Sequence, residues 1–163
     1  MTRRFDPDEF MRRVKEMGEV HPMDAGPLVA RGADVHWYGP AELKNPSRIG
    51  IVGDLPTVTF ELFLQEIEPG GSSDMQRHHH ETVHYVISGR GYSEIEDASV
   101  EWGPNDFVYT PPWTWHRHYN CDPSEPVRML GIENSRLLDL LGLNRRQSAG
   151  LASLAEARES DRH

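Results

Sequence analysis

Two short clusters hold six of the nine histidines in this chain. Histidines two residues apart on a strand point to the same face, so two imidazoles can reach one atom. Neutral imidazole is also the commonest protein ligand of a divalent transition metal. The spacing therefore predicts a metal site. The first cluster contains His78, His79, His80 and His84, and the second contains His116 and His118.

The segments around these clusters have the pattern of short β-strands. From Thr57 onward, every second residue is apolar, and the residues between them form a second, more polar row. This alternation predicts a half-buried strand. Turn residues then separate further short runs, at 84–87, 92–95, 100–102, 107–109 and 127–132, and shorter strands are predicted at 35–38 and 49–52. Many short strands with such punctuation predict an all-β sandwich or barrel. The first row is Val58, Phe60, Leu62 and Leu64, and the second is Thr59, Glu61, Phe63 and Gln65.

Helices are predicted only at the two ends of the chain. Asp6 can cap a helix over residues 6–19, where Pro7 suits the first turn. Two short helices are predicted over 137–143 and 151–158. We therefore expect three parts: an N-terminal helix and extended segment packing on the barrel (1–56), the barrel itself (57–133) and a helical tail (134–163).

Composition narrows the class of partner. The chain has 163 residues, the size of one domain, and a formal net charge of −9, which argues against nucleic-acid binding because phosphate neutralisation needs a basic surface. One cysteine, Cys121, excludes an intramolecular disulfide and a thiolate metal site. No apolar run is long enough to cross a membrane, and the N-terminus lacks the apolar stretch of a signal peptide. We expect a cytoplasmic protein with a small-molecule substrate.

Residues 65–120 resemble the two motifs of a cupin, a double-stranded β-helix related to the jelly rolls. In the second motif an acidic turn and a strand are followed by a proline, a histidine five residues later and an asparagine four residues after that. This chain supplies Asp106, the strand 107–109, Pro111, His116 and Asn120. The resemblance implies an all-β, jelly-roll-like cupin barrel in which His116 is a metal ligand.

The first motif can be aligned in two registers. If its closing glycine is Gly89, the ligand positions fall on Gln76, His78 and Thr82. If it is Gly91, they fall on His78, His80 and His84. The registers differ by two residues and keep the same strand face inward. The second is favoured, because buried histidines without a metal would leave polar nitrogens unsatisfied. Glu81 could replace the family's glutamate if a bulge turned it inward.

A finer resemblance concerns residues 112–116, Pro-Trp-Thr-Trp-His, and the Gly-Arg-Gly-Tyr stretch 89–92. Both are similar to gentisate 1,2-dioxygenase and related ring-cleaving cupins, which hold ferrous iron with three histidines and no carboxylate. Those enzymes are larger bicupins, so their substrate does not carry over. The resemblance implies Fe(II) as the favoured metal, with Zn, Ni, Mn or Cu as alternatives.

These observations lead to a metal-dependent enzyme as the first hypothesis, an Fe(II) dioxygenase acting on a small aromatic or enolic substrate. The expected metal ligands are His78, His80, His84 and His116, and the candidate proton carriers are His118 and Glu81. The alternatives are an isomerase, lyase or decarboxylase using Zn, Ni or Mn, and a non-catalytic small-molecule-binding cupin. Because the N-terminal segment could cover an edge strand, we also expect a homodimer.

Overall fold

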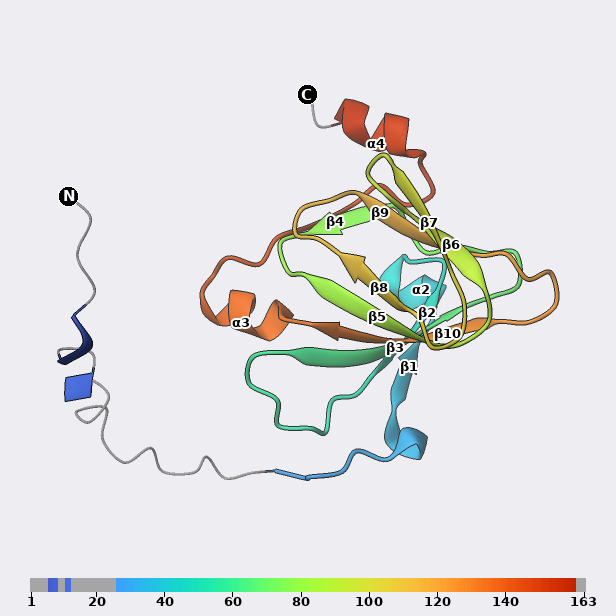
Figure 1. The fold of residues 1–163 in the computed structure, drawn as a ribbon. Coiled ribbons are helices and arrows are strands. Elements are labelled where there is room, and N and C mark those ends of the chain that lie inside the picture. The colour runs from blue at the N-terminus through green and yellow to red at the C-terminus, as the bar shows by residue number, and fades with distance from the viewer. Residues whose placement is uncertain (1–5, 9–10, 13–25, 161–163) are drawn as a thin grey trace.

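The computed structural model describes residues 6–8, 11–12 and 26–160. Eleven strands and three short helices lie within 26–160, after a 3₁₀ turn at Gly32–Asp34 (Figure 1). The helix predicted over 6–19 falls largely outside the described residues. The strands are β1 (His36–Tyr38), β2 (Arg48–Ile51), β3 (Glu61–Ile67), β4 (Gln76–His78), β5 (Thr82–Ser88), β6 (Gly91–Ile95), β7 (Ala98–Trp102), β8 (Phe107–Thr110), β9 (His116–Asn120), β10 (Val127–Glu133) and β11 (Arg146–Ser148). The helices are α2 (Pro40–Leu43), α3 (Ser135–Leu140) and α4 (Leu154–Ser160).

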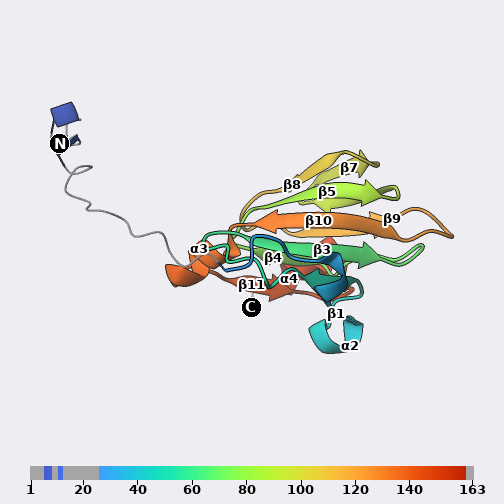
Figure 2. The same cartoon turned by 90° about the horizontal axis from the view of Figure 1, so that it is seen from below.

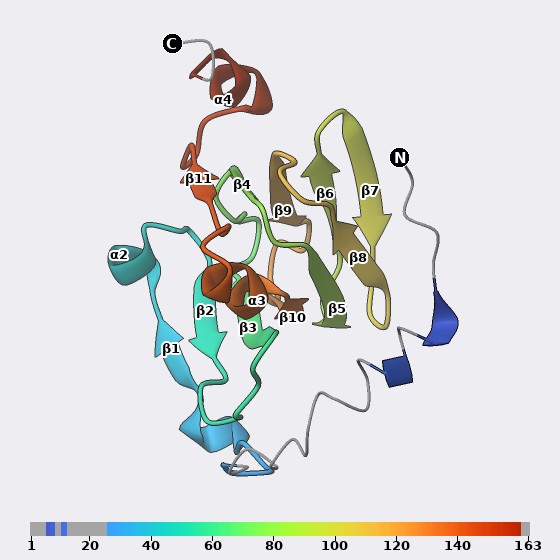
Figure 3. The same cartoon turned by 90° about the vertical axis from the view of Figure 1, so that its left-hand side faces the viewer.

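These strands form two antiparallel sheets. The six-stranded sheet has the order β1-β2-β3-β10-β5-β8, and the five-stranded sheet has the order β11-β4-β9-β6-β7 (Figure 3). The long strands β3 and β10 run side by side in the first sheet, with Leu130 opposite Leu64 (Figure 2). The two sheets confirm the predicted all-β class. Strands β1, β2 and β11 lie outside the predicted barrel range 57–133, so segments from both ends of the chain extend the sheets.

Most predicted strands are present with small changes of bounds, but the strand predicted from Thr57 begins at Glu61. In β3, Gln65 and Ile67 are buried and Phe63 lines a pocket. Leu62 and Leu64 belong to the opposite row, and both are only partly buried. The more apolar row of this strand therefore does not face the barrel interior.

One end of the barrel interior is filled by apolar side chains. All are buried, and they come from both sheets, because alternate residues of each strand face inward. The cluster consists of Ile67, Val86, Trp102, Val108, Val127 and Met129. A second buried cluster of Met75, Trp115 and Ala157 attaches α4 to the five-stranded sheet. Arg117 strengthens this attachment by donating to the carbonyl oxygens of Gly150 (2.7 Å) and Ala152 (2.8 Å).

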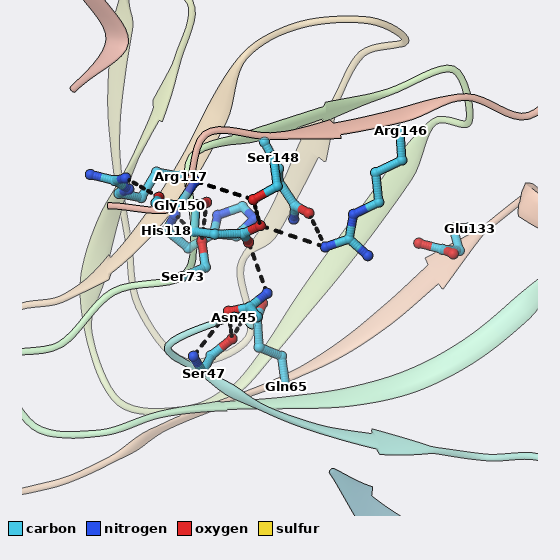
Figure 4. Close-up of polar contacts among 12 residues, drawn as sticks. Asn45, Ser47, Gln65, Ser73, Arg117, His118, Glu133, Arg146, Ser148 and Gly150 are labelled. Atoms are coloured by element: carbon cyan, nitrogen blue, oxygen red, sulfur yellow. Dashed lines mark hydrogen bonds and ion pairs between the residues drawn. The ribbon is translucent and has the colours of Figure 1, made fainter. Parts of the chain in front are cut away.

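A buried polar network joins the two sheets beside the pocket (Figure 4). Asp74 accepts hydrogen bonds from Asn45 Nδ2 (2.8 Å) and Ser148 Oγ (2.7 Å). Ser47 Oγ donates to Asn45 Oδ1 (2.7 Å) and accepts from Gln65 Nε2 (2.9 Å). The network fixes the loop before β2, the start of β4 and the strand β11 against β3. In the part of the chain that the structure describes, no helix is long and apolar enough to span a membrane.

Candidate metal and substrate site

Four buried histidines come together at the other end of the barrel interior. They are His78 on β4, His84 on β5, and His116 and His118 on β9. The ring centroids of His78 and His116 lie 4.7 Å apart, and those of His84 and His118 lie 4.6 Å apart. We call these four residues the histidine cluster. The structure thus places three of the four predicted ligands beside the predicted proton carrier His118, and the fourth, His80, stacks on His78.

Burial keeps the histidine cluster neutral. Burial, then the neighbouring imidazoles, lowers the pKa of His78, of His84 and of His116 to about 3 in each case. The same causes lower the pKa of His118 well below its ordinary value. At neutral pH these rings are therefore uncharged, and each has a nitrogen lone pair that can bind a metal.

Two members of the cluster have one ring nitrogen hydrogen-bonded to a backbone carbonyl, as is typical of metal-binding histidines. His78 Nδ1 lies 2.7 Å from the carbonyl oxygen of His80, and His116 Nδ1 lies 2.9 Å from that of Thr114. A backbone carbonyl can only accept, so each Nδ1 carries the proton and each Nε2 has the free lone pair.

The other two members each have a buried ring nitrogen without a hydrogen-bond partner among the described residues, namely His84 Nδ1 and His118 Nε2. His118 Nδ1 lies 2.7 Å from Ser93 Oγ, which accepts from Trp102 Nε1. Buried polar atoms are normally paired, so these two nitrogens are available to bind a ligand. As the rings stand, no three His, Cys, Asp or Glu side chains of the described residues converge on one point. The donors fit a divalent metal chemically, and binding would require a ring to turn.

His80 has a different environment from the other predicted ligands. It lies in the turn between β4 and β5, and its ring stacks on that of His78 at a centroid distance of 3.7 Å. Its Nδ1 is 3.1 Å from Asn144 Oδ1, and its Nε2 is 3.2 Å from Glu133 Oε2. Burial lowers the pKa of His80, but the hydrogen bond and charge of Glu133 outweigh it, so the pKa is raised. Both ring nitrogens are occupied within the protein.

Glu81 lies apart from the histidine cluster. Its side chain is exposed, and its carboxylate accepts a hydrogen bond from Tyr109 Oη at 3.0 Å. Glu81 has the same strand parity as the partly buried Val83, and both point away from the inward-facing Thr82 and His84. No bulge turns it inward. The carboxylate that contacts His80 is instead that of Glu133, the last residue of β10.

A pocket of about 200 Å³ opens beside the histidines. One wall is apolar, formed by Leu43, Ile49, Ile51 and Phe63. The polar lining residues include the first-motif positions of both registers, namely Gln76, His78, His80, Thr82 and His84, together with Asn45, Glu61, Gln65, Glu133 and Arg146. Arg146 donates to Gln76 Oε1, which positions a guanidinium at this wall. Such a pocket suits a small molecule with an apolar body and polar or anionic substituents.

Sequence reasoning missed Arg146 and Glu133. Arg146 lies on β11, within the segment predicted as a helical tail, and no local pattern marks it. Glu133 has a usable signal, since it continues the inward row of Met129 and Gly131 by one more alternate position.

Comparisons with known proteins agree with this fold. Residues 63–133 match the Cupin domain family. A gentisate 1,2-dioxygenase of Aquipseudomonas alcaligenes is 33% identical over 94 residues, 56% of this chain and 26% of the relative. A 1-methylthio-D-xylulose 5-phosphate methylsulfurylase of Rhodospirillum rubrum is 37% identical over 78 residues, 48% of this chain and 49% of the relative. The chain thus spans about a quarter of the first relative and about half of the second.

A solved cupin-2 domain structure from Rhodospirillum rubrum has a TM-score of 0.61 with this chain at 23% identity. The match covers 88% of this chain and 92% of that structure. At this identity the likeness concerns the fold. The predicted resemblance to gentisate-type dioxygenases is also confirmed by the sequence match. Residues 63–133 therefore match the cupin family, and the chain has an all-β cupin fold.

Proposed function

We propose that this protein is a metal-dependent enzyme, an Fe(II) dioxygenase that acts on a small aromatic or enolic substrate. The observation that carries the proposal is the histidine cluster: four neutral, buried imidazoles, two with unpartnered nitrogens, beside a pocket of about 200 Å³. The likeness to a gentisate 1,2-dioxygenase supports the choice of reaction.

In this proposal the metal is held by His78, His84 and His116, with His118 as a fourth donor. His80 was also expected as a ligand, but its nitrogens are occupied by Asn144 and Glu133, which favours a proton-carrying role. When bound, Fe(II) would supply redox chemistry toward dioxygen, whereas Zn, which has no redox chemistry, would supply Lewis acidity alone.

The protein's own groups have separate roles around the substrate. The raised pKa of His80 and the lowered pKa of Glu133 keep a proton on His80 Nε2, from which it can move to a substrate oxygen in the pocket. The apolar wall packs against the substrate's body and excludes water. Arg146 donates hydrogen bonds to an anionic substituent.

The first test is metal analysis of untagged protein purified without oxygen. We expect about one iron per chain, lost in His116→Ala and His84→Ala but retained in the exposed control His36→Gln. Oxygen uptake with gentisate, the substrate in one relative's name, then tests the reaction. Iron binding without uptake on a panel of hydroxylated aromatic acids and enols would contradict the dioxygenase proposal.

A second candidate is a Lewis-acid cupin that performs no oxygen chemistry. The observation that favours it is the 37% identity to the methylsulfurylase, which exceeds the 33% identity to the gentisate enzyme. Stoichiometric zinc, nickel or manganese that iron cannot replace would support this candidate. No metal even after reconstitution would contradict both enzymes and favour a small-molecule-binding module.

A further inference from the structure

The chain crosses from one sheet to the other just before His116, through the linker 111–115 that joins β8 to β9. Within this linker Trp113 has a φ of 56°, in the left-handed region that residues with a Cβ rarely adopt. Glycine would adopt this backbone freely, so a tryptophan persists here only where its surroundings hold it in place. The contacts of Trp113 lead to residues 77–79, on both sides of His78.

Trp113 holds the end of β4 with its backbone and with its ring. Its N–H donates to the carbonyl oxygen of His78 at 2.6 Å. The centroid of its ring lies 4.4 Å from that of the His79 ring, and the Arg77 guanidinium lies over the ring at 4.4 Å. Arg77 and His79 alternate with the inward-facing His78, so the ring holds β4 from outside the histidine cluster.

The sheet pairing alone does little to fix His78 relative to His116. Among the described residues, β4 and β9 pair at a single position, where Gln76 lies opposite His116. His78 lies two residues beyond that pair, so its placement relative to His116 depends on the linker. The hydrogen bond from Trp113 to the His78 carbonyl supplies this attachment.

The same linker also orients the His116 ring. The carbonyl oxygen of Thr114 accepts the hydrogen bond from His116 Nδ1 at 2.9 Å. Trp115 is held by Glu96, in the turn between β6 and β7, through two hydrogen bonds. Its N–H donates to Glu96 Oε1 at 2.6 Å, and its carbonyl oxygen accepts from the Glu96 N–H at 2.8 Å. The linker is therefore fixed at three consecutive residues, from Trp113 to Trp115.

We propose that Trp113 is a positioning residue for metal binding, which keeps His78 and His116 in a fixed relative placement with both Nε2 lone pairs available. This inference rests on the proposed function, since it concerns the same site, and it adds a residue that belongs neither to the histidine cluster nor to the pocket wall. The left-handed backbone of Trp113 is the strained conformation that these contacts maintain.

The test measures the affinity of the metal-free full chain for Co²⁺, whose visible absorption reports its ligands. Trp113→Gly keeps the left-handed backbone and its N–H but loses the ring, and we expect the affinity to fall about 10–100-fold. Trp113→Phe keeps a ring over Arg77 and should restore most of the affinity. Because Trp113 is 36% exposed, both variants should fold, which circular dichroism checks.

The matched control is Trp37→Gly. Trp37 is a partly buried tryptophan on the edge strand β1, and it also lies under an arginine, with the Arg48 guanidinium at 5.1 Å from its ring centroid. This variant should bind Co²⁺ as the wild type does. A wild type that binds Co²⁺ and a Trp113→Gly variant of unchanged affinity would overturn the proposal and leave the proposed function intact.

A second measurement needs no metal. Long-range nitrogen–proton NMR spectra distinguish the two tautomers of an imidazole, and the wild type should show the Nδ1–H form for His116. Trp113→Gly should give a mixture, because the Thr114 carbonyl is no longer held in place. If the wild type binds no Co²⁺, the proposed function fails, and the tautomer alone decides the positioning role. A mixture in the variant would support that role, and an unchanged tautomer would overturn it.

Discussion

The two ends of the barrel interior are built by the same strands with opposite chemistry. On β5, Val86 points into the apolar cluster, while His84 and Thr82, two and four residues earlier, point into the histidine end. The apolar end stabilises the fold by removing side chains from water. The histidine end buries polar nitrogens, two of them unpartnered, which destabilises the metal-free protein. An inward position on a strand therefore determines that a side chain is buried. It does not determine whether that side chain is apolar or a histidine.

The largest expected difference between the two ends is their effect on the free energy of unfolding at acid pH. Because the folded state holds His78, His84 and His116 at a pKa of about 3, only the unfolded chain takes up protons below its ordinary pKa of 6.5. The stability that depends on these three histidines staying neutral is fully present above pH 6.5 and is lost as the pH falls toward 3. At pH 5 the free energy of unfolding should drop by about 2 kcal/mol for each histidine.

Urea unfolding of metal-free protein at a series of pH values measures this effect. Stability that stays flat between pH 7.5 and 5 would show that these rings are already protonated, or are solvated, in the folded state.

Truncation in the apolar end should lower stability without affecting its pH dependence. Met129 is fully buried, so Met129→Ala should reduce the free energy of unfolding by about 2–5 kcal/mol. The slope of stability against pH between 6.5 and 5 should be that of the wild type. Met129→Leu is the volume-conserving control, with an expected loss below about 1.5 kcal/mol. A changed pH slope in Met129→Ala would mean that the two ends of the barrel are not independent.

A substitution in the histidine end should change the pH dependence of stability and leave stability at neutral pH nearly unchanged. His84→Leu removes an unpartnered buried nitrogen, so stability at pH 7.5 should change by less than about 1.5 kcal/mol. The loss of stability per pH unit should become smaller by roughly 1.4 kcal/mol, because the unfolded chain then takes up one proton fewer. The same denaturation series measures both quantities. An unaltered pH slope would remove His84 from the set of groups responsible for acid sensitivity.

Much of this molecule could be predicted from the sequence, because strands and turns leave local patterns. The apolar runs ending at Ile95, Trp102 and Ile132 became β6, β7 and β10 with bounds shifted by two residues or less. The motif around His116 correctly indicated the cupin fold. Strands β4 and β9 were not predicted as strands, because their inward residues are histidines and the apolar alternation that signals a half-buried strand is absent.

The remaining features depend on contacts between distant segments. The pairing of His80 with Glu133 joins residues more than fifty positions apart, and Arg146 reaches the pocket only because β11 pairs with β4. The row of β3 that faces inward could not be chosen from its apolarity, since the outer face of the sheet is also apolar. Only the pairing register distinguishes Phe63 and Gln65 from Leu62 and Leu64.

Gly131 sits opposite His84 in the sheet, and a Cβ at this position would lie only 2.2 Å from the Phe63 ring. The missing side chain is what allows that ring to lie edge-on to His84, at a centroid distance of 5.6 Å, as part of the pocket wall. A methyl group at position 131 would have to displace the ring. Position 131, which does not line the pocket, therefore sets the size of the pocket through the ring of Phe63.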